Sequence, residues 1–134
     1  MTCQKEIDIQ ALITTIDTAL AAVYSNYILS RNPLYDTKSI THHTPAIFVI
    51  DNSSDFVSAD GNAYTHCVST LSIFLRLSVA EEDAEKLFLE INELESLMLK
   101  IFANLPTYTI METARDIGQL EVWEEIKIKW LHKP

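Results

Sequence analysis

The chain has 134 residues, of which 48% are hydrophobic, and its formal net charge is −9. This length suits a single domain, and the apolar fraction is sufficient for a core without disulfides or a structural metal. The negative charge argues against general affinity for nucleic-acid phosphates, because such binding needs clustered lysine and arginine. The chain contains only 2 glycines, which excludes a glycine-rich phosphate-binding loop.

The cysteines and the N-terminal residues indicate the cellular setting. Cys3 and Cys67 lie far apart and form no CxxC motif, so we expect both to be reduced in a cytosolic environment. The first residues lack the basic start and apolar core of a signal peptide. No apolar run approaches the length of a membrane span.

The first predicted element is an amphipathic helix from roughly Glu6 to Tyr27. We expect it to end before Asn32-Pro33, because the residue before a proline avoids the helical conformation. The polar segment that follows could hold one strand, at Thr37–Thr41. The helix is predicted from apolar residues that recur at intervals of three and four: Ile9, Leu12, Ile13, Ile16, Ala19, Leu20 and Val23.

A proline-led apolar run, Pro45 followed by Ala46–Ile50, predicts a strand buried on both faces. Residues 51–55 and 58–62 have the composition of polar loops and turns. Within the second, Asp60-Gly61 is the strongest signal for a tight turn.

Strict alternation of polar and apolar residues from Cys67 to Val79 is the most informative feature of the sequence. It is typical of a long strand with one buried face. The apolar positions are Cys67, Leu71, Ile73, Leu75, Leu77 and Val79, and the other face carries Val68, Thr70, Ser72, Phe74, Arg76 and Ser78.

The alternation leads into a second amphipathic helix, predicted from about Glu81 to Leu105. Acidic residues crowd its first turn, where the helix dipole favours them. Leu89, Leu97 and Leu99 lie off the apolar stripe, so we expect a second contacted side, facing the first helix or a neighbouring subunit. The stripe itself consists of Ala84, Leu87, Ile91, Leu94, Met98, Ile101 and Leu105, widened by Phe88 and Phe102.

The C-terminal segment predicts a β-hairpin of Tyr108–Ala114 and Leu120–Leu131 around a turn at Asp116–Gln119. Glu124 interrupts the apolar face of its second strand and needs a partner or a sheet edge. The order helix, strand, strand, helix, strand, strand predicts one α+β domain over residues 1–134. We expect two layers, with an antiparallel sheet of four to five strands and both helices on one face.

The chemistry-bearing residues form no recognisable catalytic or metal motif. His42, His43 and His66 could join Cys67 in a zinc site, but their spacing matches no common zinc pattern, and His66 and Cys67 point to opposite faces of the strand. We therefore interpret all four histidines, including His132, as surface residues. The carboxylate pairs Asp51/Asp55 and Glu124/Glu125 flank no evident cleft. The sequence thus predicts no enzyme, no cofactor and no metal.

Aromatic residues on the polar sheet face suggest a contact surface. Phe74 and Trp123 alternate there with polar side chains, and if adjacent strands cluster them they would form an assembly surface. The candidate self-association residues are Phe74, Trp123, Leu89, Leu97 and Leu99.

The order of these elements and their residue patterns resemble those of the tail terminator proteins of long-tailed bacteriophages, the group that includes the minor tail protein U family. The resemblance rests on five features: the helix that begins near Ile9, the strand Pro45–Ile50, a mobile polar loop after it, the strand His66–Val79 that feeds the helix Ala84–Leu105, and a C-terminal strand pair. It implies a hexameric ring in the virion tail, assembled in the bacterial cytoplasm, that caps the tail tube and meets the head connector. It also implies no catalytic residues, no membrane partner and an acidic lumen through which DNA passes without specific binding.

Two other functions fit the sequence. One is a small adaptor or regulatory domain that binds a protein partner through the outer leucines of the second helix. The other is an enzyme on an α+β scaffold, which would need a cleft where His42, His43, His66 and carboxylates converge.

Overall fold

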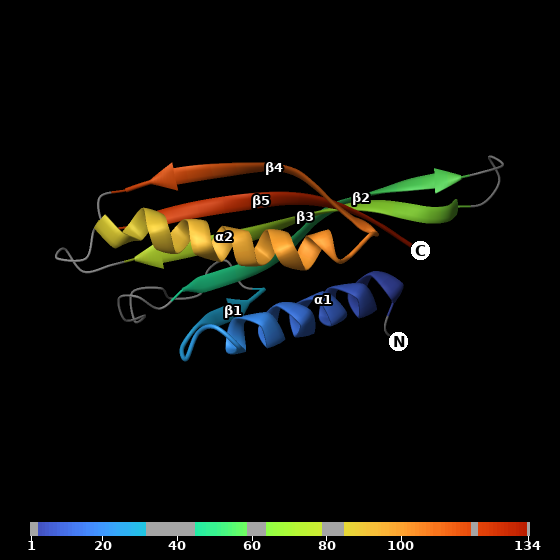
Figure 1. Ribbon diagram of the computed structural model, residues 1–134. Coiled ribbons are helices and arrows are strands. Elements are labelled where there is room, and N and C mark those ends of the chain that lie inside the picture. The colour runs from blue at the N-terminus through green and yellow to red at the C-terminus, as the bar shows by residue number, and fades with distance from the viewer. Residues whose placement is uncertain (1–2, 32–44, 59–63, 79–84, 119–120, 134) are drawn as a thin grey trace.

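The structure is a computed structural model that describes residues 3–31, 45–58, 64–78, 85–118 and 121–133. These residues form an α+β fold, as predicted (Figure 1). In chain order the elements are α1 (Gln4–Ala21), β1 (Ile28–Ser30), β2 (Ala46–Ser58), β3 (Tyr64–Ser78), α2 (Leu87–Ala103), β4 (Tyr108–Ile117) and β5 (Glu121–His132).

The five described strands form one mixed sheet in the order β1-β2-β3-β5-β4. The prediction of a purely antiparallel sheet was wrong, because β1 runs parallel to β2 while the other pairs are antiparallel. The parallel pairing begins where the Ile28 N–H donates to the Pro45 carbonyl at 2.9 Å. A strand of 3 residues is too short to show an alternating pattern, which is why the sequence did not predict it.

Two element boundaries differ from the predictions for physical reasons. Helix α1 ends at Ala21 rather than Tyr27, and Val23 is 62% exposed, because the chain turns there toward β1. Strand β2 continues to Ser58 through the predicted loop at 51–55. The polar side chains there form hydrogen bonds to the neighbouring strand β3: Ser54 with Ser69, and Asn52 with Ser72.

The remaining predicted boundaries agree in part with the structure. The predicted strand Thr37–Thr41, the turn at Asp60-Gly61 and the acidic residues 81–84 lie outside the described residues. Strand β4 extends to Ile117, into the predicted turn, and the Gly118 N–H donates to the Glu121 carbonyl at 2.7 Å to close the hairpin.

One buried cluster joins the two helices to one face of the sheet. Its sheet residues include Ile73 and Leu77, which are 0% and 2% exposed, and Cys67 on the same face of β3 is 1% exposed. The predicted helix stripes are confirmed at Ile9, Leu12, Ile16 and Leu20 of α1 and at Leu87, Ile91, Leu94, Met98, Ile101 and Phe102 of α2. Phe88 was wrongly added to that stripe, since it is 47% exposed.

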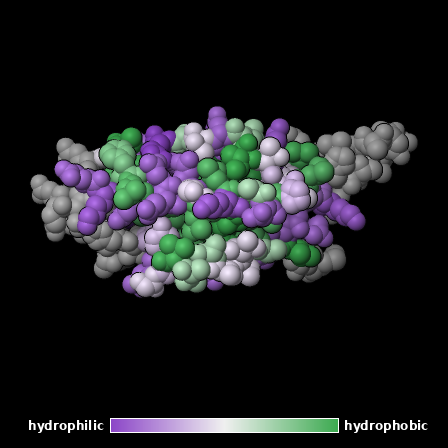
Figure 2. Space-filling model, in the orientation of Figure 1, coloured by the Kyte–Doolittle hydropathy of each residue, from purple (hydrophilic) through white to green (hydrophobic). Residues whose placement is uncertain are grey.

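We call the opposite side of the sheet the outer face. It is not open everywhere, because Ala46 and Phe48 on its β2 part are 0% and 1% exposed. The prediction that this end of β2 is buried on both sides is therefore confirmed, and the outer face is accessible mainly along β5 and β4, where Lys127 and Lys129 are exposed. On the helix side, hydrophobic and hydrophilic residues are interspersed (Figure 2).

Candidate functional site

The sheet register places aromatic and acidic side chains side by side on the outer face. Antiparallel pairing aligns residues of neighbouring strands directly opposite one another, so each row across the sheet shares a face. In the order β2, β3, β5, β4, one such row consists of Ala46, Arg76, Trp123 and Asp116. The adjacent row consists of Phe48, Phe74, Glu125 and Ala114.

The two predicted aromatic residues meet within these rows. Trp123 stacks on Phe48 with ring centroids 5.9 Å apart and an angle of 19° between the planes. Phe48 is in turn the register partner of Phe74. Phe74 and Trp123 remain partly exposed. The outer face therefore carries an aromatic cluster whose rim is accessible to a partner.

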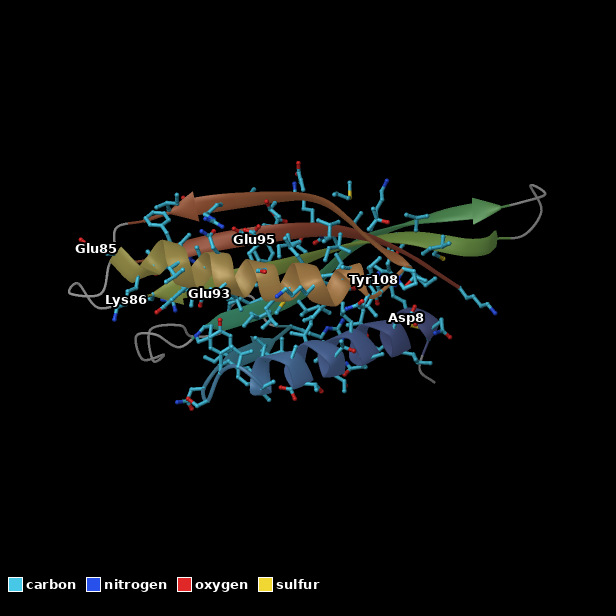
Figure 3. The ribbon with its side chains drawn as sticks, in the orientation of Figure 1. Asp8, Glu85, Lys86, Glu93, Glu95 and Tyr108 are labelled. Atoms are coloured by element: carbon cyan, nitrogen blue, oxygen red, sulfur yellow. The ribbon has the colours of Figure 1, made fainter. Side chains whose placement is uncertain are left out.

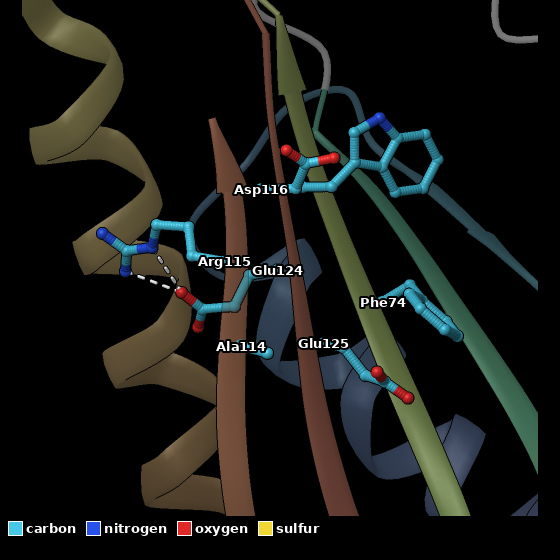
Figure 4. Close-up of a pocket in the computed structure, with 7 residues that line it drawn as sticks. Phe74, Ala114, Arg115, Asp116, Glu124 and Glu125 are labelled. Carbon is cyan, nitrogen blue, oxygen red and sulfur yellow. Dashed lines mark hydrogen bonds and ion pairs between the residues drawn. The ribbon is translucent and has the colours of Figure 1, made fainter. Parts of the chain in front are cut away.

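A hollow of about 470 Å³ opens beside these rings and is called the Trp123 hollow below (Figure 4). Ala114 faces it with only a methyl group, which leaves room between the larger neighbours. Asp116 and Glu125 supply carboxylates that form no ion pair with a described residue, although Glu125 lies close enough to Lys127 to help raise the pKa of that lysine. The hollow is lined by Phe74, Ala114, Arg115, Asp116, Trp123, Glu124 and Glu125.

Hydrogen bonds fix the rim of the hollow before any partner arrives. The indole N–H of Trp123 donates to Glu121, and Arg76 Nη2 donates to the other oxygen of the same carboxylate at 3.2 Å. The hydroxyl of Ser72 donates to Glu125 Oε2 at 2.6 Å. Side chains held in place lose less conformational entropy when they bind, which favours a contact role.

An ionic cluster lies behind the hollow, between β4, β5 and α2. Glu124 is 1% exposed, and its Oε1 accepts a hydrogen bond from Arg115 Nε at 2.7 Å and forms an ion pair with Arg115 Nη2 at 2.6 Å (Figure 4). Arg115 Nη2 also reaches Glu95 Oε2 at 2.8 Å and Asn92 Oδ1 at 3.0 Å, both on α2. In Figure 3, Glu95 lies on the side of α2 that faces the hairpin. The partner that the sequence required for Glu124 is thus Arg115.

Burial and the charge of nearby Glu95 raise the pKa of Glu124 to about 7, against the opposing effect of Arg115. Glu124 Oε2 is buried and accepts no hydrogen bond from the described residues. A proton on this oxygen can be donated to Glu95, which satisfies the buried atom. One guanidinium and one proton then balance two carboxylates.

A second polar network crosses the core face near the chain termini, and the sequence did not predict it. His132 was interpreted as a surface residue but is 8% exposed, and its Nε2 lies 2.6 Å from the hydroxyl of Ser69. Its Nδ1 donates to the Lys133 carbonyl at 2.8 Å, and in the tautomer that carries its proton on Nδ1 the Nε2 atom accepts from Ser69. The Ser69 hydroxyl lies 2.7 Å from the Ser54 hydroxyl, and the Ser54 oxygen accepts a hydrogen bond from Lys5 Nζ at 3.1 Å.

This network ties α1, β2, β3 and β5 together by a continuous series of hydrogen bonds. A serine hydroxyl within hydrogen-bond distance of an imidazole is also the arrangement found in nucleophilic catalytic sites. Here Ser69 is 0% exposed, so no substrate reaches its oxygen in this conformation. We interpret the pair as a structural link.

The candidate leucines of α2 do not form one surface. Leu89 is 61% exposed, whereas Leu97 packs against the core cluster and borders a separate hollow of about 300 Å³ with Val23 and Tyr24. Leu97 and Leu99 are two residues apart, which places them on nearly opposite sides of a helix. The structure therefore brings together Phe74 and Trp123, but not the three leucines.

The described residues provide no arrangement of ligands for the zinc site considered in the sequence analysis. His42, His43 and the side chain of His66 lie outside the described residues. In the described part of the chain, no group of histidine, cysteine, aspartate and glutamate is arranged to hold a metal ion. Neither described helix is long and apolar enough to cross a membrane.

No protein-family model matches this sequence. No curated protein is significantly similar to it.

Proposed function

We propose that this chain is a structural assembly protein that associates with copies of itself, and that its assembly is a ring of the phage tail terminator type. The observation that carries the proposal is the Trp123 hollow. Phe74 and Trp123 are held at its rim and remain partly exposed instead of entering the core. Aromatic residues in such positions commonly anchor protein contacts.

The edge of the sheet offers a second surface for assembly. Strand β4 has 10 residues and, among the described strands, pairs only with β5, so no described strand covers the backbone groups of its other edge. Met111 and Ile117 on this strand are 51% and 55% exposed. A ring needs more than one contact surface on each subunit, and exposed strand edges are suited to join chains.

In this role the chain would act in the virion tail after assembly in the bacterial cytoplasm, between the tail tube and the head connector. The net charge of −9 supports a lumen that DNA passes without adhering, since acidic walls repel phosphate. The proposed function requires no cofactor, no membrane and no catalytic residue.

Light scattering coupled to size exclusion, over a range of protein concentrations, tests the proposal. We expect the wild type to reach a multiple of its 15.2 kDa, six for the ring, and Trp123→Ala to remain smaller. Thr14→Ala, an exposed change on α1 away from the outer face and from β4, is the control and should behave like the wild type. A monomeric wild type at every concentration would refute self-assembly.

The adaptor function remains a second candidate because of one observation. Phe88 and Leu89 are 47% and 61% exposed in the first turn of α2, where they could contact a different protein. That function predicts a monomer whose size does not change in Trp123→Ala. It also predicts that Leu89→Ser abolishes partner binding.

A further inference from the structure

The outer face of β5 has a charge pattern that divides at Ile126. Before this residue the outward positions are Glu121, Trp123 and Glu125, and after it they are Lys127, Lys129 and, at the end of the strand, the exposed Leu131. The neighbouring strand adds Asp116 beside Trp123 at the acidic end. One half of the strand is therefore acidic and aromatic, and the other half is basic.

Such a pattern is complementary to itself when the strand is reversed. If two outer faces meet with their β5 strands antiparallel, about a two-fold axis at Ile126, residues equally distant from Ile126 lie opposite each other. Glu125 then faces Lys127 of the second copy, and Trp123 faces Lys129 of the second copy. The parallel arrangement would place lysine against lysine and glutamate against glutamate, which costs free energy.

The Trp123 hollow suits the lysine that this arrangement brings to it. Lys129 is exposed and has no ion-pair partner among the described residues. An ammonium group over the indole of Trp123 gains a cation–π interaction. Asp116 at the edge of the hollow supplies a carboxylate that no described cation neutralises.

We propose that the outer faces of two copies of this chain pair antiparallel about Ile126, with Glu125 of each copy against Lys127 of the other and Lys129 of each copy in the Trp123 hollow of the other. The pairing rests on the proposed function only in requiring self-association. It leaves the free edge of β4 available for other contacts within a larger assembly. The contact is isologous, because both copies use the same surface.

Two charge reversals and their mixture test the pairing. Glu125→Lys alone places lysine against Lys127 of the second copy, and Lys127→Glu alone places glutamate against Glu125. We expect either variant to weaken dimerisation at least about tenfold in sedimentation equilibrium, as like charges at an interface do. An equimolar mixture restores an opposite charge at every contact, so it should form a heterodimer with near wild-type affinity.

Controls separate this inference from changes in folding and from the broader proposal. Both variants should keep the wild-type circular dichroism. Lys127→Glu removes only the exposed Lys127–Glu112 ion pair, and Glu125→Lys removes one hydrogen bond, from Ser72, at a partly exposed position. Lys100→Glu on α2, away from the outer face, should associate like the wild type. If the wild type associates but the single variants are unaffected, or the mixture stays dissociated, the pairing is wrong and self-assembly stands. If the wild type is monomeric throughout, both are wrong.

Discussion

Arg115 on β4 and the buried Glu124 on β5 form an ion pair in which one carboxylate oxygen accepts a hydrogen bond from Nε at 2.7 Å and lies 2.6 Å from Nη2. The same guanidinium reaches Glu95 on α2 at 2.8 Å. The pair therefore holds the edge strand to the centre of the sheet and to the helix that covers it. Because one positive charge serves two carboxylates, the stability of this region should depend on pH.

The first prediction concerns that dependence. The pKa of Glu124 in the folded protein is raised to about 7, above its ordinary value, so the folded state holds a proton that the unfolded state releases between about pH 4.5 and 7. Stability contributed by Glu124 is thus present at low pH and is lost as pH rises through this window. We expect a loss of about 2 kcal/mol between pH 5 and 8, read from urea unfolding.

Glu124→Gln should remove this part of the pH dependence. The amide keeps an oxygen for Arg115 and gains an N–H for Glu95, so it mimics the protonated acid at every pH. The variant should match the wild type at pH 5 and exceed its stability at pH 8. Glu112→Gln, which changes a carboxylate that is 58% exposed, should retain the wild-type profile. Identical profiles for the wild type and Glu124→Gln would show that Glu124 is ionised throughout.

The second prediction tests which face of β3 is buried. Leu75 is 0% exposed and lies in the core cluster, with Ile47 as a register partner. Leu75→Asp places an unpaired charge there and should unfold the domain, while Leu75→Ala should cost about 2–5 kcal/mol. Thr109→Asp, on an exposed position of β4, should melt like the wild type. A folded Leu75→Asp protein would reverse the assignment of the two faces.

The third prediction separates contact from core roles at Trp123. Because Trp123 is partly exposed and lies over the buried Phe48 instead of entering the core itself, Trp123→Ala should reduce oligomer size more than thermal stability. We expect the melting temperature to fall by only a few degrees, as for the loss of about 1 kcal/mol of stacking. Sedimentation velocity and calorimetry on one sample measure both effects. An unchanged oligomer with a large loss of stability would assign Trp123 to folding alone.

The parts of the fold that could be predicted from sequence are those with a long, regular pattern. The alternation in β3 and the stripe of α2 identified buried positions such as Ile73, Leu75 and Met98 correctly. Strand β1 has too few residues for any period to emerge. The second half of β2 was mistaken for a loop, because its polar side chains satisfy partners on β3 that a local pattern does not reveal.

The candidate site was predictable only as separate residues. Phe74 and Trp123 were visible as exceptions in alternating strands, but Phe48 lies in a wholly apolar run that carries no information about faces. Glu124 was recognised as needing a partner, whereas the choice of Arg115 depends on the hairpin register. Ser69 and His132 are 63 positions apart, and only the pairing of β3 with β5 brings them together.

The last prediction concerns this Ser69–His132 contact. Ser69→Ala leaves Nε2 of a buried imidazole without its donor, which should destabilise the fold by about 1–3 kcal/mol. Ser96→Ala on an exposed face of α2 is the control and should change stability little. Replacing both partners, Ser69→Ala with His132→Phe, removes the unsatisfied acceptor and keeps a ring against Trp130, which lies 5.1 Å away. The double variant should therefore recover part of the lost stability in urea unfolding, whereas additive losses would show that the hydroxyl and the imidazole act independently.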